Sequence, residues 1–298
     1  MKCDYCAKNA VYKNEKKYEC SSHFIKRFEK TVLNTIKSEK LITKTDKIIV
    51  GLSGGKDSLA VLYILKKNYK NQIQALLVDE GIKGYREHTT EIAKKYCKEW
   101  GVKLIIRTFK DETGKTLDQI KELINNAPCY PCGVFRREIL NKTARELKFT
   151  KMVSGHNLDD EVQAIMMNFF MGDVNRQTRM GYTTGKVKNK GFIPRIKPLR
   201  NLTEKQIMLY NQLMNFTQSF IECPNVKESY RIMIRDYLND YENKHPGTKK
   251  NILNSYEGWI RKRIKTHVTQ QIINDCEICE EPTSGIICKT CKLKKMIK

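Results

Sequence analysis

Short apolar runs alternate, along the middle of the chain, with longer segments whose apolar residues recur at helical spacing. The short runs predict strands at 47–52, 73–81, 103–109 and the start of 151–170. The longer segments predict helices at 24–38, 57–68, 86–101, 117–124, 135–148 and the end of 151–170. Strands that alternate with helices of this length form right-handed crossovers and a parallel sheet covered on both faces. We therefore predict an α/β fold.

Polar motifs follow three of the predicted strands. They are "SGGKDS" at 53–58, "DEG" at 79–81 and "SGHNLDDE" at 154–161. Ligands of parallel sheets bind at the carboxyl ends of the strands, so the three motifs are expected along one edge of the sheet. The sequence therefore predicts a ligand site at that edge.

The motif "SGGKDS" has the composition of a phosphate-binding turn. Successive backbone N–H groups of a glycine turn, followed by a helix N-terminus, form a nest for anions. Lys56 adds a positive charge, and the hydroxyl groups of Ser53 and Ser58 donate further hydrogen bonds. Asp57 can cap the helix or help to hold Mg²⁺. Only two glycines precede the lysine, so the spacing differs from that of a Walker loop.

The net charge indicates a polyanionic partner. The 298-residue chain has 56 Lys and Arg against 33 Asp and Glu, a formal charge of +23. Such an excess repels itself unless a polyanion binds, and we expect RNA. Segments 230–253 and 259–268 mix aromatic and basic residues on predicted helices, as RNA-binding surfaces do. Segment 171–182 is basic without regular periodicity, which favours a mobile loop near the site.

The chain has eleven cysteines, and the expected cellular compartment decides whether they more often bind metal or form disulfides. There is no run of about eighteen apolar residues and no charged-then-apolar leader, so we expect a soluble, cytoplasmic protein without membrane contact. Because the cytosol keeps thiols reduced, many cysteines in such a chain favour metal binding over disulfides.

Cysteine pairs at both ends of the chain have the spacing of zinc ligands. Two chelating pairs joined by a short loop can occupy the corners of one tetrahedron, leaving no open position for catalysis. A segment of about twenty-five residues cannot bury a core of its own, so metal binding would supply its folding free energy. The two predicted structural Zn²⁺ sites are Cys3, Cys6, Cys20 and His23 at the N-terminus, and Cys276, Cys279, Cys288 and Cys291 at the C-terminus.

The remaining cysteines suggest a different kind of site. Cys129 and Cys132 lie in "PCYPCG", and Cys223 follows far downstream, whereas Cys97 stands alone on a predicted helix as a core residue. Three thiolates without an obvious fourth ligand fit an open or catalytic cluster, and an adjacent proline is common beside iron–sulfur ligands. A reactive disulfide pair with Cys223 as resolving thiol and a structural zinc completed by a histidine are the alternatives.

These motifs together resemble a known family. "SGGKDS" is similar to the pyrophosphate loop (PP-loop) of the N-type ATP pyrophosphatases, which cut ATP between the α and β phosphates. With terminal zinc modules, "PCYPCG", a distant third cysteine and "SGHNLDDE", the chain resembles the tRNA 2-thiouridine synthetases, sulfurtransferases of the archaeal, eukaryotic cytosolic and thermophilic bacterial type. The resemblance covers nearly the whole chain. It implies a Rossmann-like PP-loop domain flanked by the two zinc modules.

The resemblance also implies a reaction. The C2 oxygen of a tRNA uridine would attack the α-phosphate of ATP, pyrophosphate would leave, and sulfur would then displace AMP from C2. In this family Cys129, Cys132 and Cys223 would hold a [4Fe-4S] cluster whose fourth iron can bind sulfide, and a cysteine persulfide is the older alternative. Wobble uridine 34 is the preferred target, with 5-methyluridine 54 second. The sulfur donor would be sulfide or a ubiquitin-like thiocarboxylate protein, and homodimerisation is a family-level expectation.

Site residues are carried over from the family by motif. Those expected to bind ATP are Ser53, Gly54, Gly55, Lys56, Asp57, Ser58, Asp79, Gly155 and Asp160. The expected catalytic residues are Asp160, Lys56 and Arg136, with Asp159 as the alternative carboxylate. Arg136 stands where some relatives have a lysine, so phosphate contact is expected of it rather than proton transfer. His156 is expected to be a turn residue.

The motifs divide the chain into five segments. They are an N-terminal zinc finger (1–25), a linking helix (26–45), the PP-loop domain with the iron–sulfur site (46–225), a helical tRNA-binding extension (226–273) and a C-terminal zinc ribbon (274–298).

Two other classes of function share some of these features. A tRNA lysidine synthetase or a cytidine thiolase would share "SGGKDS", but the former needs no cysteine trio and the latter is not expected to carry both zinc modules. A non-enzymatic zinc-dependent RNA-binding adaptor would not need the nucleotide edge.

Overall fold

A six-stranded sheet forms the centre of the computed structural model, which describes residues 1–298 except 15–16, 125–126, 186–190, 218–220, 268–272 and 298. The strands are β3 (Ile48–Gly51), β4 (Ile73–Asp79), β5 (Lys103–Thr108), β6 (Lys151–Val153), β7 (Thr183–Thr184) and β8 (Arg195–Ile196). Their order is β5-β4-β3-β6-β8-β7, and only β7 is antiparallel to its neighbour. This confirms the predicted α/β class, with β7 and β8 as additions.

The strand order places a switch point between β3 and β6. From β3 the chain proceeds outward through β4 and β5, then returns to pair β6 with the other side of β3, with Val50 opposite Val153. Crossovers on the two sides of such a point run in opposite directions, which opens a crevice at the carboxyl ends of the strands. "SGGKDS" follows β3 and "SGHNLDDE" follows β6, so both motifs border this crevice.

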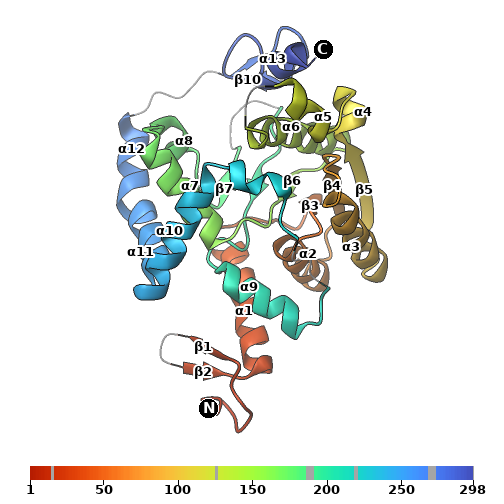
Figure 1. Cartoon of the computed structure of the whole chain (residues 1–298). Coiled ribbons are helices and arrows are strands. Elements are labelled where there is room, and N and C mark those ends of the chain that lie inside the picture. Colours follow the sequence, from red (N-terminus) through yellow and green to blue (C-terminus); the bar gives the residue numbers. More distant parts are fainter. Residues whose placement is uncertain (15–16, 125–126, 186–190, 218–220, 268–272, 298) are drawn as a thin grey trace.

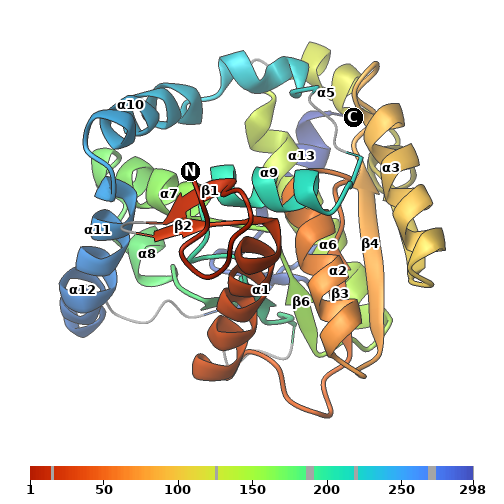
Figure 2. The ribbon, with the colours of Figure 1, turned by 90° about the horizontal axis from the view of Figure 1, so that it is seen from below.

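Helices cover both faces of the sheet because side chains alternate along the buried strands. Ile48 and Val50 pack with α1 (Ser21–Ser38), α2 (Lys56–Asn68), α3 (Arg86–Glu99) and α9 (Glu204–Leu213). Ile49 packs on the other face, against the C-terminal end of α6 (Cys129–Glu146). Figure 2 shows α1 and α2 in front of the strands. Helices α4 (Phe109–Thr113) and α5 (Leu117–Leu123) pack near the first turns of α6.

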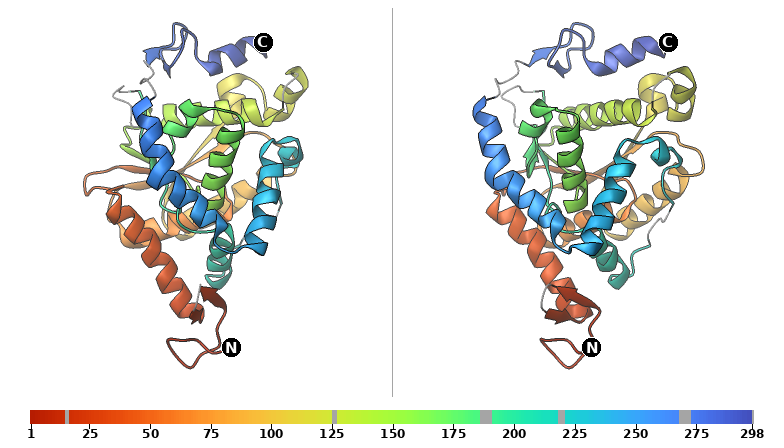
Figure 3. Two further views of the ribbon diagram at one scale, coloured as in Figure 1. Left: turned by 90° about the vertical axis from the view of Figure 1, so that its left-hand side faces the viewer. Right: turned by 60° about the vertical axis from the view of Figure 1, so that its left-hand side comes forward.

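A second group of helices packs on α7 (Leu158–Phe170). It contains α8 (Val174–Thr178), α10 (Arg231–Lys244), α11 (Thr248–Ser255), a π-helical turn η2 (Tyr256–Ile260) and α12 (Arg261–His267). Figure 3 shows α10, α11 and α12 as a layer beside α7. A short 3₁₀ helix, η1 (Pro224–Glu228), precedes α10. Among the described residues, no helix is long and apolar enough to cross a membrane.

Small hairpins form the two ends of the chain. The N-terminal hairpin pairs β1 (Tyr12–Asn14) with β2 (Lys17–Glu19), and the C-terminal one pairs β9 (Asn274–Asp275) with β10 (Pro282–Thr283) before α13 (Lys289–Met296). Figure 1 places them at opposite ends of the molecule. Leu293 and Ile297 pack in the same apolar cluster as Cys132 and Phe135, so the C-terminal module supports the start of α6.

Two local expectations are wrong. The helix predicted at 135–148 begins earlier, so Cys129 and Cys132 lie in the first turns of α6, and Pro128 at its N-cap position already has helical backbone angles (φ −61°, ψ −21°). The segment 171–182 is not an irregular loop throughout. Asp173 accepts a hydrogen bond from the Arg176 backbone N–H and so caps the short helix α8.

Candidate functional site

The turn between β3 and α2 is built as an anion cradle. Ser58 Oγ accepts a hydrogen bond from the Ser53 backbone N–H (3.2 Å) and donates one to the Gly55 carbonyl (2.9 Å). Gly54 has φ of +80°, and a Cβ there would lie 2.0 Å from the Thr89 carbonyl oxygen, so no other residue fits. Helix α2 begins after Gly55, which provides no side-chain cap, and the N–H groups of its first turn therefore face the edge of the sheet.

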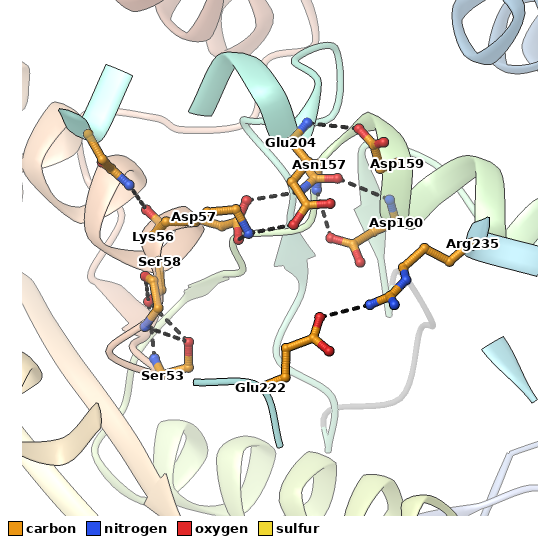
Figure 4. A network of polar contacts seen from close by, with 12 residues as sticks. Ser53, Lys56, Asp57, Ser58, Asn157, Asp159, Asp160, Glu204, Glu222 and Arg235 are labelled. Atoms are coloured by element: carbon orange, nitrogen blue, oxygen red, sulfur yellow. Dashed lines mark hydrogen bonds and ion pairs between the residues drawn. The ribbon is translucent and has the colours of Figure 1, made fainter. Parts of the chain in front are cut away.

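The loop after β6 packs directly against this cradle. A Cβ on Gly155 would lie 3.0 Å from the backbone of Asp57, so glycine permits the close approach of the two loops. Asn157 Nδ2 donates a hydrogen bond to Asp57 Oδ1 (2.9 Å). The same asparagine forms a capping box with Asp160 at the start of α7. One asparagine therefore fixes the position of Asp57 relative to Asp160 (Figure 4).

Lys56 lies between two carboxylates. Its Nζ donates to Asp57 Oδ2 (3.2 Å) and to Glu204 Oε1 (2.7 Å). Burial would lower the pKa of Lys56, but the charges of Asp57 and Glu204 outweigh burial and raise it. Burial raises the pKa of the Asp57 carboxyl, with Lys56 opposing and Asp160 reinforcing the rise. The lysine therefore stays charged.

The neighbouring carboxylates Asp159 and Asp160 have different surroundings. Asp159 is buried, pairs with Lys249 of α11, and accepts a hydrogen bond from the Glu204 backbone N–H (2.8 Å). Asp160 is partly exposed and accepts a hydrogen bond from Arg231 (3.1 Å). Burial raises its pKa, and Arg231 opposes that rise. Figure 4 shows Asp159 directed toward Glu204 and Asp160 directed away from it.

A buried arginine connects the end of β4 with the phosphate cradle. Arg86 donates to the Ser53 carbonyl (2.9 Å) and to the Val78 carbonyl, and pairs with Glu80 (2.7 Å). Asp79, the predicted nucleotide neighbour, accepts a hydrogen bond from the Gly81 backbone N–H (2.8 Å). Glu80 is the buried residue of the pair, and Asp79 is the one that remains partly accessible.

The three central cysteines converge although Cys223 is distant in sequence. Cys129 Sγ lies 3.8 Å from the Asn225 carbonyl oxygen in η1, which places the start of α6 beside Cys223. Burial raises the pKa of Cys132 and of Cys223, and the nearby thiolate of Cys129 adds to both shifts. Cys129 is exposed, so the group is open to solvent on one side.

Arg136 lies against this cysteine group rather than against the cradle. Its guanidinium donates to Cys132 Sγ (3.4 Å) and lies 3.5 Å from Glu80. Since Glu80 also pairs with Arg86, one carboxylate is shared between the cysteine group and the phosphate cradle. Cations beside thiolates stabilise the deprotonated form that metal ligation requires.

The donor set at the centre fits an iron–sulfur cluster better than zinc. A zinc ion with bonds of about 2.3 Å holds its sulfurs about 3.8 Å apart, whereas thiolates bound to separate irons lie further apart. In the part of the chain that the structure describes, only the two terminal groups bring three or more such ligand atoms within 4.8 Å of one another. The ligand atoms of the central trio are therefore not all within 4.8 Å of one another, and the trio has three donors rather than four.

The terminal groups have the geometry of closed tetrahedral sites. At the N-terminus, Cys20 Sγ lies 3.2 Å from His23 Nδ1 and 3.7 Å from Cys6 Sγ. At the C-terminus, Cys279 and Cys288 have sulfurs 3.6 Å apart. These separations are close to the edges of a zinc tetrahedron, about 3.6–3.8 Å. All eight predicted zinc ligands thus lie in two compact groups.

The sequence did not indicate several residues that shape the site. Glu204, Arg231 and Lys249 come from α9, α10 and α11, and each reaches a residue of the cradle or of α7. No motif surrounds them, and their pairing depends on tertiary structure. Glu80 and Arg86 have a clearer signal in the sequence. Glu80 lies in the "DEG" motif at the end of a predicted strand, and Arg86 follows that motif closely.

Comparisons with known proteins agree with this geometry. The family model of the PP-loop domain matches residues 21–241. The tRNA 2-thiolation protein NcsA of Haloferax volcanii is 34% identical over 100% of this chain and 99% of its own. The tRNA-5-methyluridine(54) 2-sulfurtransferase of Pyrococcus horikoshii is 36% identical over 100% of this chain and 96% of its own.

A solved structure extends the comparison to three dimensions. The U34-tRNA thiolase NcsA of Methanococcus maripaludis, solved with its [4Fe-4S] cluster, matches with a TM-score of 0.84 at 36% identity. The match covers 99% of this chain and 96% of that one. Family model, full-length relatives and fold thus agree. The chain belongs to the PP-loop family and, within it, to the tRNA 2-thiolation proteins and sulfurtransferases.

Proposed function

We propose that this protein is an ATP-dependent tRNA sulfurtransferase that converts a tRNA uridine to 2-thiouridine. The observation that carries the proposal is the shared carboxylate: Glu80 contacts Arg86 of the phosphate cradle and Arg136 of the cysteine group. An activating site and a sulfur-handling site lie at one edge of the sheet. The family membership supports the same assignment.

The cradle would act in the first step. The C2 oxygen of the uridine attacks the α-phosphate, and pyrophosphate leaves as the bond to the α-phosphate forms. The N–H groups at the start of α2 and the Lys56 ammonium would hold the departing pyrophosphate and stabilise its growing charge. Asp57 lies beside Lys56 and is the residue we propose to help hold Mg²⁺.

Asp160 would accept the proton that this step releases. When the C2 oxygen is adenylated, the uracil loses the proton on N3, and a nearby carboxylate can take it. The raised pKa of Asp160 makes it a stronger base than an ordinary aspartate. Asp159 is already bound to Lys249 and to α9, which favours Asp160 for this role.

Sulfur would enter from the cysteine side. We propose that Cys129, Cys132 and Cys223 hold a [4Fe-4S] cluster, and that the terminal groups each hold Zn²⁺. When bound, a cluster with three protein ligands supplies an iron with an open position for sulfide. Sulfide supplied from this side would attack C2 of the adenylated uridine, AMP would leave, and loss of the remaining proton would give the 2-thio group. Arg136 beside Cys132 would balance negative charge there.

The position of the modified uridine is also part of this proposal. The relatives differ in the position that they name, U34 for the thiolase of M. maripaludis and uridine 54 for the sulfurtransferase of P. horikoshii. We propose wobble uridine 34. We also propose a cytoplasmic location, where thiols stay reduced, sulfide or a thiocarboxylate protein as donor, and a homodimer.

Nucleoside mass spectrometry of tRNA from cells that lack the protein tests the function. Loss of 2-thiouridine at position 34, restored by the wild-type gene, is the expected result. Loss at position 54 instead would retain the chemistry and change the target. Unchanged thiolation at both positions would refute the proposed function.

A further inference from the structure

A cavity adjoins the candidate active site through Asp160. It has a volume of about 270 Å³ and is bounded by α7, α8, β7, β8 and the start of α10. Among its described lining residues none comes from "SGGKDS". The volume is slightly below that of pockets for drug-sized ligands, about 300–1,000 Å³, and suits one nucleobase.

The walls of this cavity are cationic on balance. Its lining includes four basic side chains, Arg176, Arg179, Lys197 and Arg231, and two carboxylates, Asp160 and Glu161. Buried Glu161 is already neutralised, since it pairs with Lys197 and with Arg200 (2.7 Å). An excess of two positive charges therefore lines a concave site, and such a site attracts anions.

Neutral groups in the cavity suit a base. The His156 side chain is exposed into it, and His156 Nδ1 lies 2.8 Å from Ser154 Oγ. The surrounding protein and the charge of Lys197 lower the pKa of His156, which favours the neutral imidazole. Ala164 and Met180 add apolar surface. Together they offer hydrogen bonds and a stacking face.

Further cations extend from the cavity toward the C-terminal module. Arg137 and Lys289 have exposed side chains, and Arg195 is half-buried. Burial lowers the pKa of Arg195, and the charge of Arg137 lowers it further. Arg195 Nε is buried without a hydrogen-bond partner. Among the described ion pairs of this group, Arg176 contacts Asp173 (3.0 Å), and no carboxylate is paired with Arg137, Arg195 or Lys289.

We propose that this cavity receives the target nucleotide of an RNA loop, and that Arg137, Arg176, Arg179, Arg195 and Lys289 bind the phosphates that flank it. The inference rests on the proposed function and adds the route by which the substrate reaches Asp160. Bases turned out of a loop enter pockets and stack there, while phosphates bind arginine and lysine. The five cations lie outside the extension at 226–273 that the sequence predicts for tRNA, and that extension contributes Arg231 to the cavity.

Salt-dependent binding of tRNA tests the phosphate contacts. The double variant Arg137→Gln and Lys289→Gln removes two cations, and each lost phosphate contact lowers the slope of log Kd against log salt by about 0.7–0.9. We expect a slope lower by about 1.5 and binding about tenfold weaker at low salt. The pair Arg176→Gln and Arg179→Gln repeats the measurement should the first variant fail to fold.

The matched control removes two cations from the other side of the molecule. Lys66 of α2 and Lys98 of α3 are exposed, and Figure 1 shows their helices away from α8 and α13. The variant Lys66→Gln and Lys98→Gln should keep the wild-type slope. Equal effects of control and test variants would overturn the assigned surface, because the binding would then follow net charge alone.

Filling the cavity tests the base site. Ala164→Phe, with Thr184→Phe as a second variant, should abolish tRNA thiolation while ATP binding and the salt slope stay near wild type. A tRNA with 5-bromouridine at the target position should photo-cross-link to the segment 171–185. Normal thiolation by both filled variants, or cross-links confined to residues 235–255, beyond the cavity lining, would overturn the inference. A wild-type protein that binds tRNA but never thiolates it would instead refute the proposed function.

Discussion

The terminal and central cysteine groups use the same side chain in two different settings. Each terminal group has four donors gathered around a short hairpin and the start of the helix that follows it, with ligand atoms within 4.8 Å of one another. The central group has three donors, held by the start of α6 and by the turn before η1, and Cys129 is exposed. Four donors close a metal site, and three leave a position for a reactant. We therefore propose that the terminal groups stabilise the fold and that the central group takes part in the reaction.

The two carboxylates at the start of α7 show the same contrast. Asp159 is buried and fully engaged by Lys249 and by the backbone of α9. Asp160 lines a cavity and is partly exposed, although its carboxylate accepts hydrogen bonds from Arg231 and from the Asn157 backbone N–H. Adjacent residues of one type therefore serve as a structural anchor and as a group available to a substrate.

The largest effect is expected at the open cysteine group. Cys129→Ala should reduce the thiolation rate about 1,000-fold or more, because the three ligands act as a unit. Anaerobic protein should be brown, and the variant should be colourless with both zinc ions retained. Absorption spectra and metal analysis measure this. Cys97→Ala is the control, a buried lone cysteine outside both kinds of group, and should keep its colour and activity.

The second-largest effect on the thiolation rate is expected for Asp160, the more accessible of the two carboxylates at the start of α7. Asp160→Asn should lower the thiolation rate about 100-fold or more, because it removes the proposed base while preserving shape. The fold should be unchanged by circular dichroism. A near wild-type rate would transfer the proposed role of base to another group.

The same substitution one residue earlier should act on stability. Asp159→Asn leaves Lys249 buried without its charge partner, and we expect about 3–5 kcal/mol lower free energy of unfolding. Urea denaturation of the two variants side by side measures the difference. If Asp160→Asn proved the more destabilising variant, the assignment of anchor and base would be reversed.

Removing one ligand from a terminal cysteine group should have a smaller effect on the thiolation rate. Cys288→Ser should release one zinc ion and expose the C-terminal module to protease, because metal binding supplies its folding free energy. Leu293 and Ile297 would then no longer support α6, so thiolation should fall about tenfold. Limited proteolysis and zinc analysis report the first effect. Unaltered proteolysis would show that the module folds without its metal.

A shift of pH dependence is the smallest expected effect. Burial raises the pKa of Asp160 and Arg231 restrains that rise, so activity should fall as the pH drops through this raised pKa. Arg231→Ala removes the restraint, and the acidic limb of the kcat/KM profile should move to higher pH. An unmoved limb would mean that another group limits the rate in acid.

The sequence predicts the parts of the site that local chemistry determines. The turn "SGGKDS" needs glycine at 54, and "SGHNLDDE" needs glycine at 155, for steric reasons. Ligand spacing alone indicates both terminal groups. Tertiary pairing could not be predicted in the same way. Lys249 and Glu204 reach the site from helices without a motif, and α6 begins at Cys129, earlier than the predicted helix at 135–148.

Single-turnover thiolation under anaerobic conditions tests the central claim most directly. Purified protein, ATP, sulfide and unmodified tRNA are combined, and nucleosides, AMP and pyrophosphate are quantified for wild type and Cys129→Ala. The expected result is equal amounts of 2-thiouridine, AMP and pyrophosphate with the wild type and no 2-thiouridine with the variant. A colourless wild-type protein that thiolates tRNA, or full activity of Cys129→Ala, would contradict the assignment of the central cysteines as the reactive metal site.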